Sequence, residues 1–204
     1  MSDKWNFALP RVVPLVVVEE ASWIDPLVKS FAEANVTSVE IGLRTPHALA
    51  AIEAFAAAGA FRVGAGTVTT TRQVDEVRDA GATFGLSPWG DPTVVDYAQS
   101  LDWPFIPGAA TPTEVNRLVS IGCETVKIFP VKQLGGVSFL TSLGAVFPEA
   151  SFLPTGGITA DTAADYLAVK QVVAISGSWL APAADMRDER WEDITRRLRE
   201  STTL

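Results

Sequence analysis

One stretch decides the expected fold: SVEIGLRTPHALAAIEAFAAAGAFRVGA, residues 38–65. It opens with a short apolar run, continues after Thr45-Pro46 as an alanine-rich amphipathic segment, and passes through Gly59 into a second apolar run. A threonine before a proline favours the start of a helix, and a glycine after an apolar turn favours its end. The stretch therefore predicts a strand, a helix and a second strand parallel to the first.

The same pattern repeats eight times along the chain. The predicted strands, each a short and mostly apolar run, are Arg11–Val18, Ser38–Leu43, Phe61–Ala65, Thr83–Ser87, Pro104–Pro107, Thr125–Phe129, Ser151–Thr155 and Val172–Ser176. The predicted helices are Ser22–Ala34, Pro46–Ala57, Thr70–Ala80, Pro92–Gln99, Pro112–Ile121, Gly136–Leu143, Thr159–Val169 and Glu189–Glu200. Strict alternation predicts an α/β protein with one domain, residues 1–204, folded as a single compact (β/α)8 TIM barrel. An open doubly wound sheet is the alternative.

The chain length leaves little room beyond the repeats. With 204 residues, each of eight units would take about 25, against ~250 residues for a typical barrel. We therefore expect short loops and no inserted lid. A short N-terminal segment, residues 1–10, precedes the first strand, and we expect it to plug the bottom of the barrel with Trp5 and Phe7 as packing residues.

Composition excludes several kinds of function. There are 16 Lys and Arg against 24 Asp and Glu, a net charge of −8, which disfavours a nucleic-acid partner. His47 and Cys123 are the sole histidine and cysteine, so a multi-histidine metal site and an intramolecular disulfide are excluded. We expect His47 at a rim and Cys123 as a small buried residue. No signal-peptide core or membrane span is recognisable, which predicts a cytoplasmic protein with no membrane partner.

Lys127 stands out among the residues near strand ends, where a (β/α)8 barrel carries its active site. It lies between Val126 and Ile128 in an apolar strand. Burying an ammonium is costly, and a lysine made neutral by burial becomes a nucleophile that can form a Schiff base with a carbonyl group. The alternative is a buried ion pair with a purely structural role.

Glu40 is the natural partner of this lysine, because it too is embedded in an apolar strand. A carboxylate beside such a lysine can act as general acid and base, or can simply be its ion-pair partner. Arg44, just past the same strand, suits bidentate recognition of a carboxylate, although a surface arginine is an equal alternative. Thr67 closes a Gly-Ala-Gly-Thr run that lets a ligand approach the backbone, or that a turn requires.

Two glycine-containing segments follow the last two predicted strands. They are Thr155-Gly156-Gly157 and Ser176-Gly177-Ser178. Barrels often bind phosphate with the loops after strands seven and eight, and glycine amides and small hydroxyl groups suit that ligand. The pair predicts a phosphate site, with tight turns as the alternative.

The motifs in their order resemble those of a known enzyme family. They are Glu40-x-x-x-Arg44-Thr, Val63-Gly-Ala-Gly-Thr67-Val, Ser87-Pro88, Pro107-Gly108-x-x-Thr111-x-x-Glu114, Lys127-x-Phe129-Pro130, Pro154-Thr-Gly-Gly-Ile158 and Gly177-Ser178-Trp179. Over roughly residues 11–182 the chain resembles the 2-keto-3-deoxy-6-phosphogluconate (KDPG) aldolase and 4-hydroxy-2-oxoglutarate aldolase family.

The resemblance implies a class I aldolase that needs no metal or other cofactor. In that family Lys127 would form the Schiff base with pyruvate, and Glu40 would be the general acid and base. Arg44, Thr67 and the backbone near Pro88 would hold the pyruvate carboxylate, and Phe129 would pack against pyruvate. The phosphate of the aldehyde would be held by Thr155, Gly156, Gly157 and Ser178. The family also implies a homotrimer in the Entner–Doudoroff pathway.

Three residues distinguish the rim of this chain from the family pattern. Trp89 stands where relatives commonly have glycine. Glu19 and Glu20 follow the first strand, and we expect them near the phosphate loops, where their charge would weaken phosphate binding. Cleavage of KDPG to pyruvate and glyceraldehyde 3-phosphate is the reaction that the resemblance implies, with 4-hydroxy-2-oxoglutarate as a further substrate. An aldolase for the 6-phosphogalactonate epimer or for an unphosphorylated keto acid is the alternative. A non-covalent isomerase or synthase, and a non-catalytic metabolite-binding barrel, are the rival classes.

Overall fold

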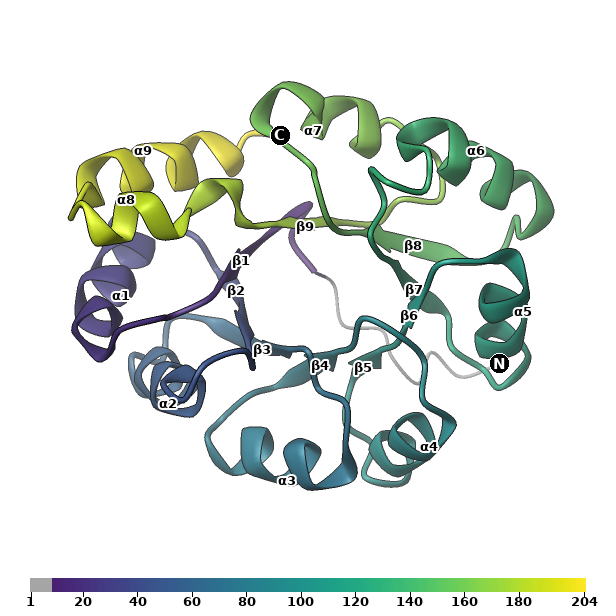
Figure 1. Ribbon diagram of the computed structural model, residues 1–204, viewed down its shortest axis with the longest axis horizontal. Coiled ribbons are helices and arrows are strands. Elements are labelled where there is room, and N and C mark those ends of the chain that lie inside the picture. The colour runs from purple at the N-terminus through teal and green to yellow at the C-terminus, as the bar shows by residue number, and fades with distance from the viewer. Residues whose placement is uncertain (1–8) are drawn as a thin grey trace.

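The computed structural model describes residues 9–204, and its strands lie in the middle of the molecule with helices around them (Figure 1). The strands are β1 (Val12–Val16), β2 (Ser38–Gly42), β3 (Arg62–Gly66), β4 (Phe84–Leu86), β5 (Phe105–Ile106), β6 (Gly108–Ala109), β7 (Thr125–Ile128), β8 (Ser151–Pro154) and β9 (Ile175–Gly177). The predicted alternation of strands and helices is present.

The helices follow the strands as the sequence pattern indicates. They are α1 (Ile24–Glu33), α2 (Ala48–Ala57), α3 (Thr71–Asp79), α4 (Pro92–Ser100), α5 (Pro112–Ser120), α6 (Gly136–Val146), α7 (Ala160–Leu167), α8 (Ala183–Arg187) and α9 (Trp191–Ser201), with 3-10 turns η1 (Ala21–Trp23) and η2 (Ser178–Leu180). Asp91 and Thr111 cap α4 and α5 through their side chains, with a proline in each first turn, as their sequence predicts. The short helix α8 was not predicted.

The prediction of a closed eight-stranded barrel is wrong. The strands form a six-stranded parallel sheet of order β5-β4-β3-β2-β1-β9 and a separate three-stranded parallel sheet of order β6-β7-β8. The predicted fifth strand, Pro104–Pro107, is split: β5 pairs with β4, whereas β6 pairs with β7. Between β8 and β9 there are only the isolated bridges Phe152↔Val172 and Thr155↔Ser176.

Prolines explain both interruptions, because a proline has no amide hydrogen to donate. Pro107 accepts a hydrogen bond from the Lys127 amide (2.9 Å) but cannot return one, and the ladder changes sheets there. On β8 the Phe152 amide donates to the Gln171 carbonyl (2.7 Å). Amides two residues apart in a strand face the same neighbour, so Pro154 removes the next bond on that side.

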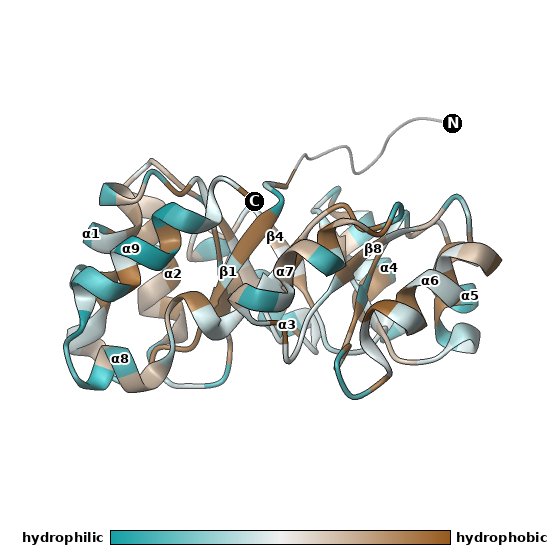
Figure 2. Ribbon diagram, turned by 90° about the horizontal axis from the view of Figure 1, so that it is seen from above, coloured by the Kyte–Doolittle hydropathy of each residue, from teal (hydrophilic) through white to brown (hydrophobic). Residues whose placement is uncertain are grey.

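Apolar side chains fill the space between the two sheets as well as the space under the helices. A small inner cluster draws on strands of both sheets: Val13, Phe84, Leu86, Ile106, Leu153 and Ala174, with Leu9 packed against it. The larger cluster joins the outer faces of the strands to the helices. Figure 2 shows the resulting pattern, with apolar strands inside and polar residues along the outer turns of the helices.

Two further predictions concern the N-terminal segment and membrane-spanning helices. The plug formed by residues 1–10, with Trp5 and Phe7 as packing residues, falls mostly outside the described residues, which begin at Leu9. Of the helices within residues 9–204, none combines the length and the apolar character that crossing a membrane requires.

The inner cluster depends on a glycine in β3, which gives the first prediction. A Cβ on Gly64 would lie 2.3 Å from two carbons of the Phe84 ring. Gly64→Ala should therefore lower the free energy of unfolding by about 1–3 kcal/mol, the usual cost of overpacking a core. Urea denaturation followed by circular dichroism measures this change.

Gly42→Ala is the matched control in the neighbouring strand, because its new Cβ would approach no heavy atom closer than 3.3 Å, to Val17 Cγ2. It should unfold closer to the wild-type urea midpoint. Equal midpoints for Gly64→Ala and the wild type would contradict the packing argument.

Candidate active site

The predicted pairing of Lys127 with Glu40 is present in the structure. Lys127 Nζ donates to Glu40 Oε1 over 2.9 Å, and the two residues are 2% and 1% exposed. Lys127 comes from β7 of the three-stranded sheet and Glu40 from β2 of the six-stranded sheet, so the ion pair joins the two sheets. At this burial the opposite charges and the hydrogen bond offset the loss of water around each group.

The backbone leaves room for the Glu40 carboxylate at one glycine. A Cβ on Gly66 would lie 2.3 Å from Glu40 Oε1 and 3.0 Å from its Cδ. Gly66 pairs with Gly42 in the parallel register of β3 and β2 and precedes Thr67. The glycines of the Gly-Ala-Gly-Thr run therefore have a physical reason: Gly64 admits the Phe84 ring, and Gly66 admits the carboxylate.

Ser176 also contacts the carboxylate of Glu40, and this contact was not predicted from the sequence. Its Oγ donates to Glu40 Oε2 over 2.6 Å, and the residue has no exposed surface. The sequence placed Ser176 in a phosphate loop with Ser178. The alternation of side chains in a strand could have indicated this contact. Ala174 belongs to the inner cluster, and Ser176, two residues later, points to the same side of the strand.

Thr155 is buried beside Ser176, which it pairs with in an isolated bridge. Among the described residues, its Oγ1 is the buried side-chain oxygen that has no hydrogen-bond partner. A buried hydroxyl without a partner costs free energy, so this oxygen is available to a ligand or to water.

Arg44 and Thr67 are hydrogen-bonded to each other just past the C-terminal ends of β2 and β3. Arg44 Nε donates to Thr67 Oγ1 over 3.2 Å, and the arginine is exposed. Thr67 has φ +63°, a conformation that a β-branched residue rarely adopts. The Leu43 amide bonds the Gly66 carbonyl (2.8 Å) and the Val68 amide bonds the Leu86 carbonyl (3.0 Å), which hold this turn in place. The arrangement places Arg44 just past the C-terminal end of β2, the strand that carries Glu40.

The turn after β8 carries the two predicted glycines in a left-handed conformation. Gly156 has φ +100° and Gly157 has φ +78°. A Cβ on Gly156 would lie 3.2 Å from two carbons of the half-buried Phe129 ring, and one on Gly157 would lie 2.6 Å from Lys132 Cβ. Phe129 and this turn are therefore brought together. Ser178 is exposed at the start of η2, and the Thr155↔Ser176 bridge places its segment beside the turn.

The segment after β4, residues 87–89, brings its backbone close to β6. A Cβ on Gly108 would lie 2.4 Å from the carbonyl carbon and oxygen of Pro88, so these two backbones approach closely. Ser87 is buried and its Oγ donates to the Trp89 carbonyl over 2.6 Å. Trp89 is 53% exposed, so much of this residue faces solvent.

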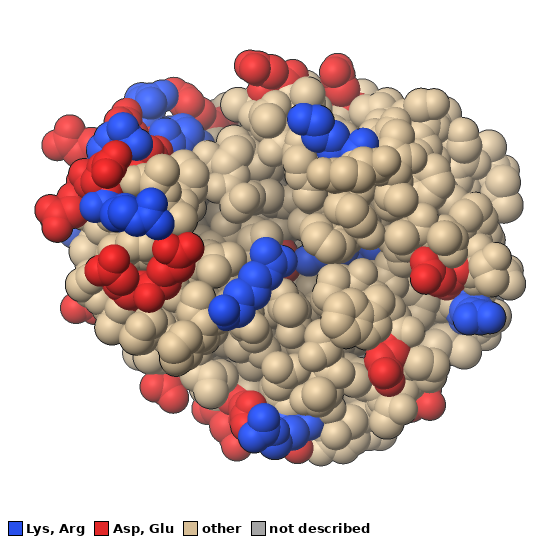
Figure 3. Space-filling view, in the orientation of Figure 1, with Lys and Arg blue, Asp and Glu red and all other residues tan. Residues whose placement is uncertain are grey.

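Charges near the mouth are partly balanced. The Glu19 carboxylate accepts a hydrogen bond from Arg187 of α8 over 3.1 Å, which offsets the charge expected to repel phosphate. In Figure 3 mixed acidic and basic side chains gather over α1, α8 and α9, whereas basic side chains lie beside a hollow near the centre of the face.

Other titratable groups have structural roles. Cys123 is buried, as predicted, and burial together with the Asp96 charge raises the pKa of its thiol to about 11. Glu114 completes the cap of α5, and hydrogen bonds from the Ala110 amide and from Thr111 hold the pKa of its carboxyl below the usual range. His47 is half-buried before α2. Within residues 9–204 no group of three or more His, Cys, Asp or Glu side chains could hold a metal ion.

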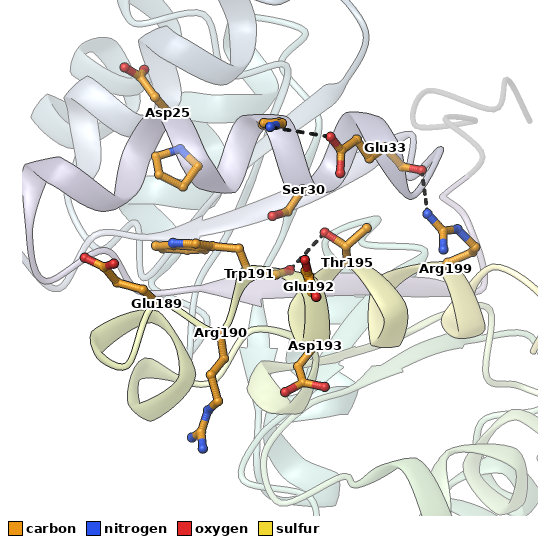
Figure 4. Close-up of a pocket in the computed structure, with 12 residues that line it drawn as sticks. Asp25, Ser30, Glu33, Glu189, Arg190, Trp191, Glu192, Asp193, Thr195 and Arg199 are labelled. Carbon is orange, nitrogen blue, oxygen red and sulfur yellow. Dashed lines mark hydrogen bonds and ion pairs between the residues drawn. The ribbon is translucent and has the colours of Figure 1, made fainter.

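A separate groove of about 1050 Å³ lies between α1 and α9 (Figure 4). Two contacts cross or line it: Lys29 pairs with Glu33 at 3.8 Å, and Arg199 of α9 donates to the Glu33 backbone carbonyl over 3.1 Å. The groove contains none of the residues predicted for the site.

Comparisons with known proteins agree with the resemblance in the sequence. The family model for KDPG and KHG aldolases matches residues 6–197. The KHG/KDPG aldolase of Escherichia coli K12 is 37% identical over 191 residues, 93% of this chain and 90% of the relative. The 2-dehydro-3-deoxy-phosphogluconate aldolase of Treponema pallidum (strain Nichols) is 35% identical over 186 residues, 91% of this chain and 89% of the relative.

A solved structure gives the same picture at the level of the fold. The KDPG aldolase of Legionella pneumophila, with pyruvate captured as a covalent carbinolamine intermediate, has a TM-score of 0.90 and 32% identity to this chain. The comparison covers 95% of this chain and 94% of that one.

The buried ion pair gives a prediction about stability. Glu40→Leu should lower the free energy of unfolding by about 3–5 kcal/mol, because it leaves the Lys127 ammonium buried without a partner. Adding Lys127→Met should recover part of this loss, since it removes the stranded charge. Urea denaturation of the four proteins of this double-mutant cycle measures the coupling.

The exposed pair Lys29–Glu33 serves as the control for this cycle. Its removal should change the free energy of unfolding by less than about 1 kcal/mol. Strictly additive effects of the Glu40 and Lys127 substitutions would contradict the proposed coupling.

Proposed function

The chain belongs to the KDPG and KHG aldolase family, and we propose that it is a class I aldolase that cleaves KDPG to pyruvate and glyceraldehyde 3-phosphate. It is a lyase, and 4-hydroxy-2-oxoglutarate is a further substrate. One observation carries the proposal: the buried hydrogen bond between Lys127 Nζ and Glu40 Oε1. It places the only kind of side chain that forms a Schiff base with a ketone next to a group that can accept and return its proton.

The reaction begins with proton transfer inside the pair. Glu40 accepts a proton from the Lys127 ammonium, which leaves a neutral amine beside a neutral acid. The Nζ lone pair attacks the C2 ketone of the keto acid, the C–N bond forms, and the oxygen takes up a proton to give a carbinolamine. Loss of water then gives an iminium ion, and Glu40 is left as a carboxylate.

The carbon–carbon bond breaks in the next step. Glu40 removes the proton of the C4 hydroxyl, directly or through a water. The C4–O bond becomes a carbonyl, and the C3–C4 electron pair moves into the iminium ion to form an enamine. Glyceraldehyde 3-phosphate leaves. Protonation of C3 and hydrolysis of the imine then release pyruvate and restore the Lys127 amine. The iminium ion serves as the electron sink.

The remaining residues bind the two halves of the substrate. Arg44 and Thr67, joined by their hydrogen bond, hold the pyruvate carboxylate together with the backbone near Pro88. A guanidinium presents paired donors that match a carboxylate. Phe129, which packs against Gly156, lies against the pyruvate carbons.

The phosphate of the aldehyde half is bound by Thr155, Gly156, Gly157 and Ser178 in this proposal. The positive φ of both glycines turns this backbone sharply, and successive amides in such a turn make a concavity for an anion. The pairing of Glu19 with Arg187 supports a phosphorylated substrate, because it offsets a negative charge near this end. The homotrimer and the place in the Entner–Doudoroff pathway stay predictions from the family, and the cytoplasmic location stays a prediction from the sequence.

Trapping the imine tests the proposed chemistry. Incubation with pyruvate and sodium borohydride should reduce the imine to a stable amine, and peptide mass spectrometry should place the adduct on Lys127. Lys127→Met should lose both the adduct and cleavage of KDPG. Lys132→Ala, a lysine outside the proposed chemistry, should keep the adduct.

Three outcomes would contradict the proposed Schiff-base chemistry. Full cleavage of KDPG by Lys127→Met would overturn the Schiff-base mechanism. An active enzyme that forms no adduct on Lys127 would favour the non-covalent isomerase or synthase class. Ligand binding without turnover of any keto acid would favour the non-catalytic reading.

Ser178 tests the phosphate site. Ser178→Ala should lower kcat/KM for KDPG by about 10-fold or more, because a hydrogen bond to a charged group contributes roughly 1.5–3 kcal/mol. It should leave kcat/KM for unphosphorylated 4-hydroxy-2-oxoglutarate within about 2-fold, since that substrate lacks the phosphate. Ser120→Ala, at the exposed end of α5, should change neither. A parallel fall for both substrates would place Ser178 outside the phosphate site.

A further inference from the structure

The Glu40 carboxylate is held at both oxygens by different elements. Oε1 accepts from Lys127 Nζ of β7 over 2.9 Å, and Oε2 accepts from Ser176 Oγ of β9 over 2.6 Å. All three residues are 2% exposed or less. We propose that Ser176 is a positioning residue, whose hydroxyl holds Glu40 in place for its proton transfers once Lys127 has become an imine. This inference rests on the proposed function.

The two hydrogen bonds change differently during the reaction. Once Nζ is bonded to the substrate carbon, the iminium ion and the enamine keep one N–H, and the bonds around that carbon set where this hydrogen points. The Ser176 hydroxyl takes no part in that bond and remains a donor to Oε2 throughout. During the covalent stage it is therefore the contact that the reaction leaves unchanged, and it restricts rotation of the Glu40 side chain about its three bonds, which keeps the orientation that proton transfer needs.

The backbone makes the Ser176 contact specific. The register of β1 with β9 pairs Val13 with Ser176, and the register of β1 with β2 pairs Leu15 with Glu40, so β1 sets the separation of donor and acceptor. On the far side of the carboxylate, Gly66 leaves just enough space for Oε1. The carboxylate is thus fixed by a serine on one strand and by the absence of a side chain on another.

A hydrogen bond to Oε2 also matters for charge. Glu40 must be a carboxylate to take the C4 hydroxyl proton, and a donor to a buried carboxylate stabilises its charged form. A purely structural hydroxyl would satisfy the buried oxygen without any preference among reaction steps. The two roles can be separated, because Glu40 exchanges protons with Lys127 through their existing contact while the imine forms, whereas afterwards its carboxylate must be oriented toward the bound substrate.

The experiment compares these two partial reactions in Ser176→Ala. The first is trapping of pyruvate on Lys127 by borohydride, followed by mass spectrometry. The second is exchange of the pyruvate methyl protons with deuterated water, followed by nuclear magnetic resonance, which requires the imine to form the enamine and return. Steady-state cleavage of KDPG gives kcat and KM. All rates are normalised to folded protein.

We expect Ser176→Ala to trap pyruvate within about 3-fold of the wild-type rate. Methyl exchange and kcat should fall by about 10- to 100-fold, a part of the 10²- to 10⁴-fold that a positioned acid or base typically contributes. KM should change little. Ser176→Gly, which lacks the hydroxyl but differs in volume, should show the same loss.

Ser38→Ala is the matched control. Ser38 lies on β2, two residues before Glu40, is 1% exposed and donates its Oγ to the Arg62 carbonyl over 3.1 Å. Its substitution removes a buried serine hydroxyl from the strand of Glu40 without touching the carboxylate. It should leave both partial reactions at wild-type rates.

The outcomes separate this inference from the proposed function. If the wild type forms no adduct and exchanges no methyl protons, the proposed function fails. If the wild type does both and Ser176→Ala matches it, or loses both reactions in proportion, the inference about Ser176 fails alone. A loss that is much larger for Ser176→Gly than for Ser176→Ala would assign the effect to packing and would also overturn it.

Discussion

The buried ion pair between Lys127 and Glu40 links the two sheets and stands at the centre of the candidate site. Two charges withdrawn from water are tolerated only when their geometry is good and their remaining oxygens have donors. Here Lys127 satisfies one carboxylate oxygen and Ser176 the other. The pair joins β7 of one sheet to β2 of the other, so chemistry and the joining of the two sheets rely on the same contact.

The surroundings of the pair keep its geometry in place. The inner apolar cluster contains Phe84 and Leu153, and Leu153 pairs with Lys127 in the register of β7 and β8. This cluster excludes water beneath the site, and a low local dielectric strengthens the interaction between the two charges. The gap in the hydrogen-bond ladders at Pro107 and Pro154 does not open the molecule, because apolar packing and the ion pair both cross between the sheets.

The local sequence pattern predicted the positions of most strands and helices, but not how the strands are divided between two sheets. An apolar strand around Lys127 and another around Glu40 could be recognised from a few neighbours, and the two residues do meet. Local pattern could not exclude the closed barrel. Whether Pro154 interrupts the hydrogen bonds between β8 and β9 depends on which neighbouring strand its nitrogen, which carries no hydrogen, faces. Ser176 and Ser178 illustrate the same limit. They stand two residues apart, yet the first is wholly buried against Glu40 and the second is exposed, because the strand ends at Gly177 and η2 begins at Ser178.

Departures from ordinary local preference gather at this site. Thr67 is held at positive φ, whereas the other non-glycine residues of the described range with positive φ are Asn35, Asp102 and Glu189, none of them β-branched. Thr155 is the described residue that buries a hydroxyl oxygen without a partner. A strained threonine and an unpartnered hydroxyl each cost free energy that packing elsewhere must offset, and a buried ion pair requires two charges to be withdrawn from water. Their meeting in one place is hard to explain by stability alone, because each could be relieved by a simpler residue. A site that must hold a ligand carboxylate, a reacting carbonyl and a mobile proton needs such groups, and this gives a physical reason for retaining them.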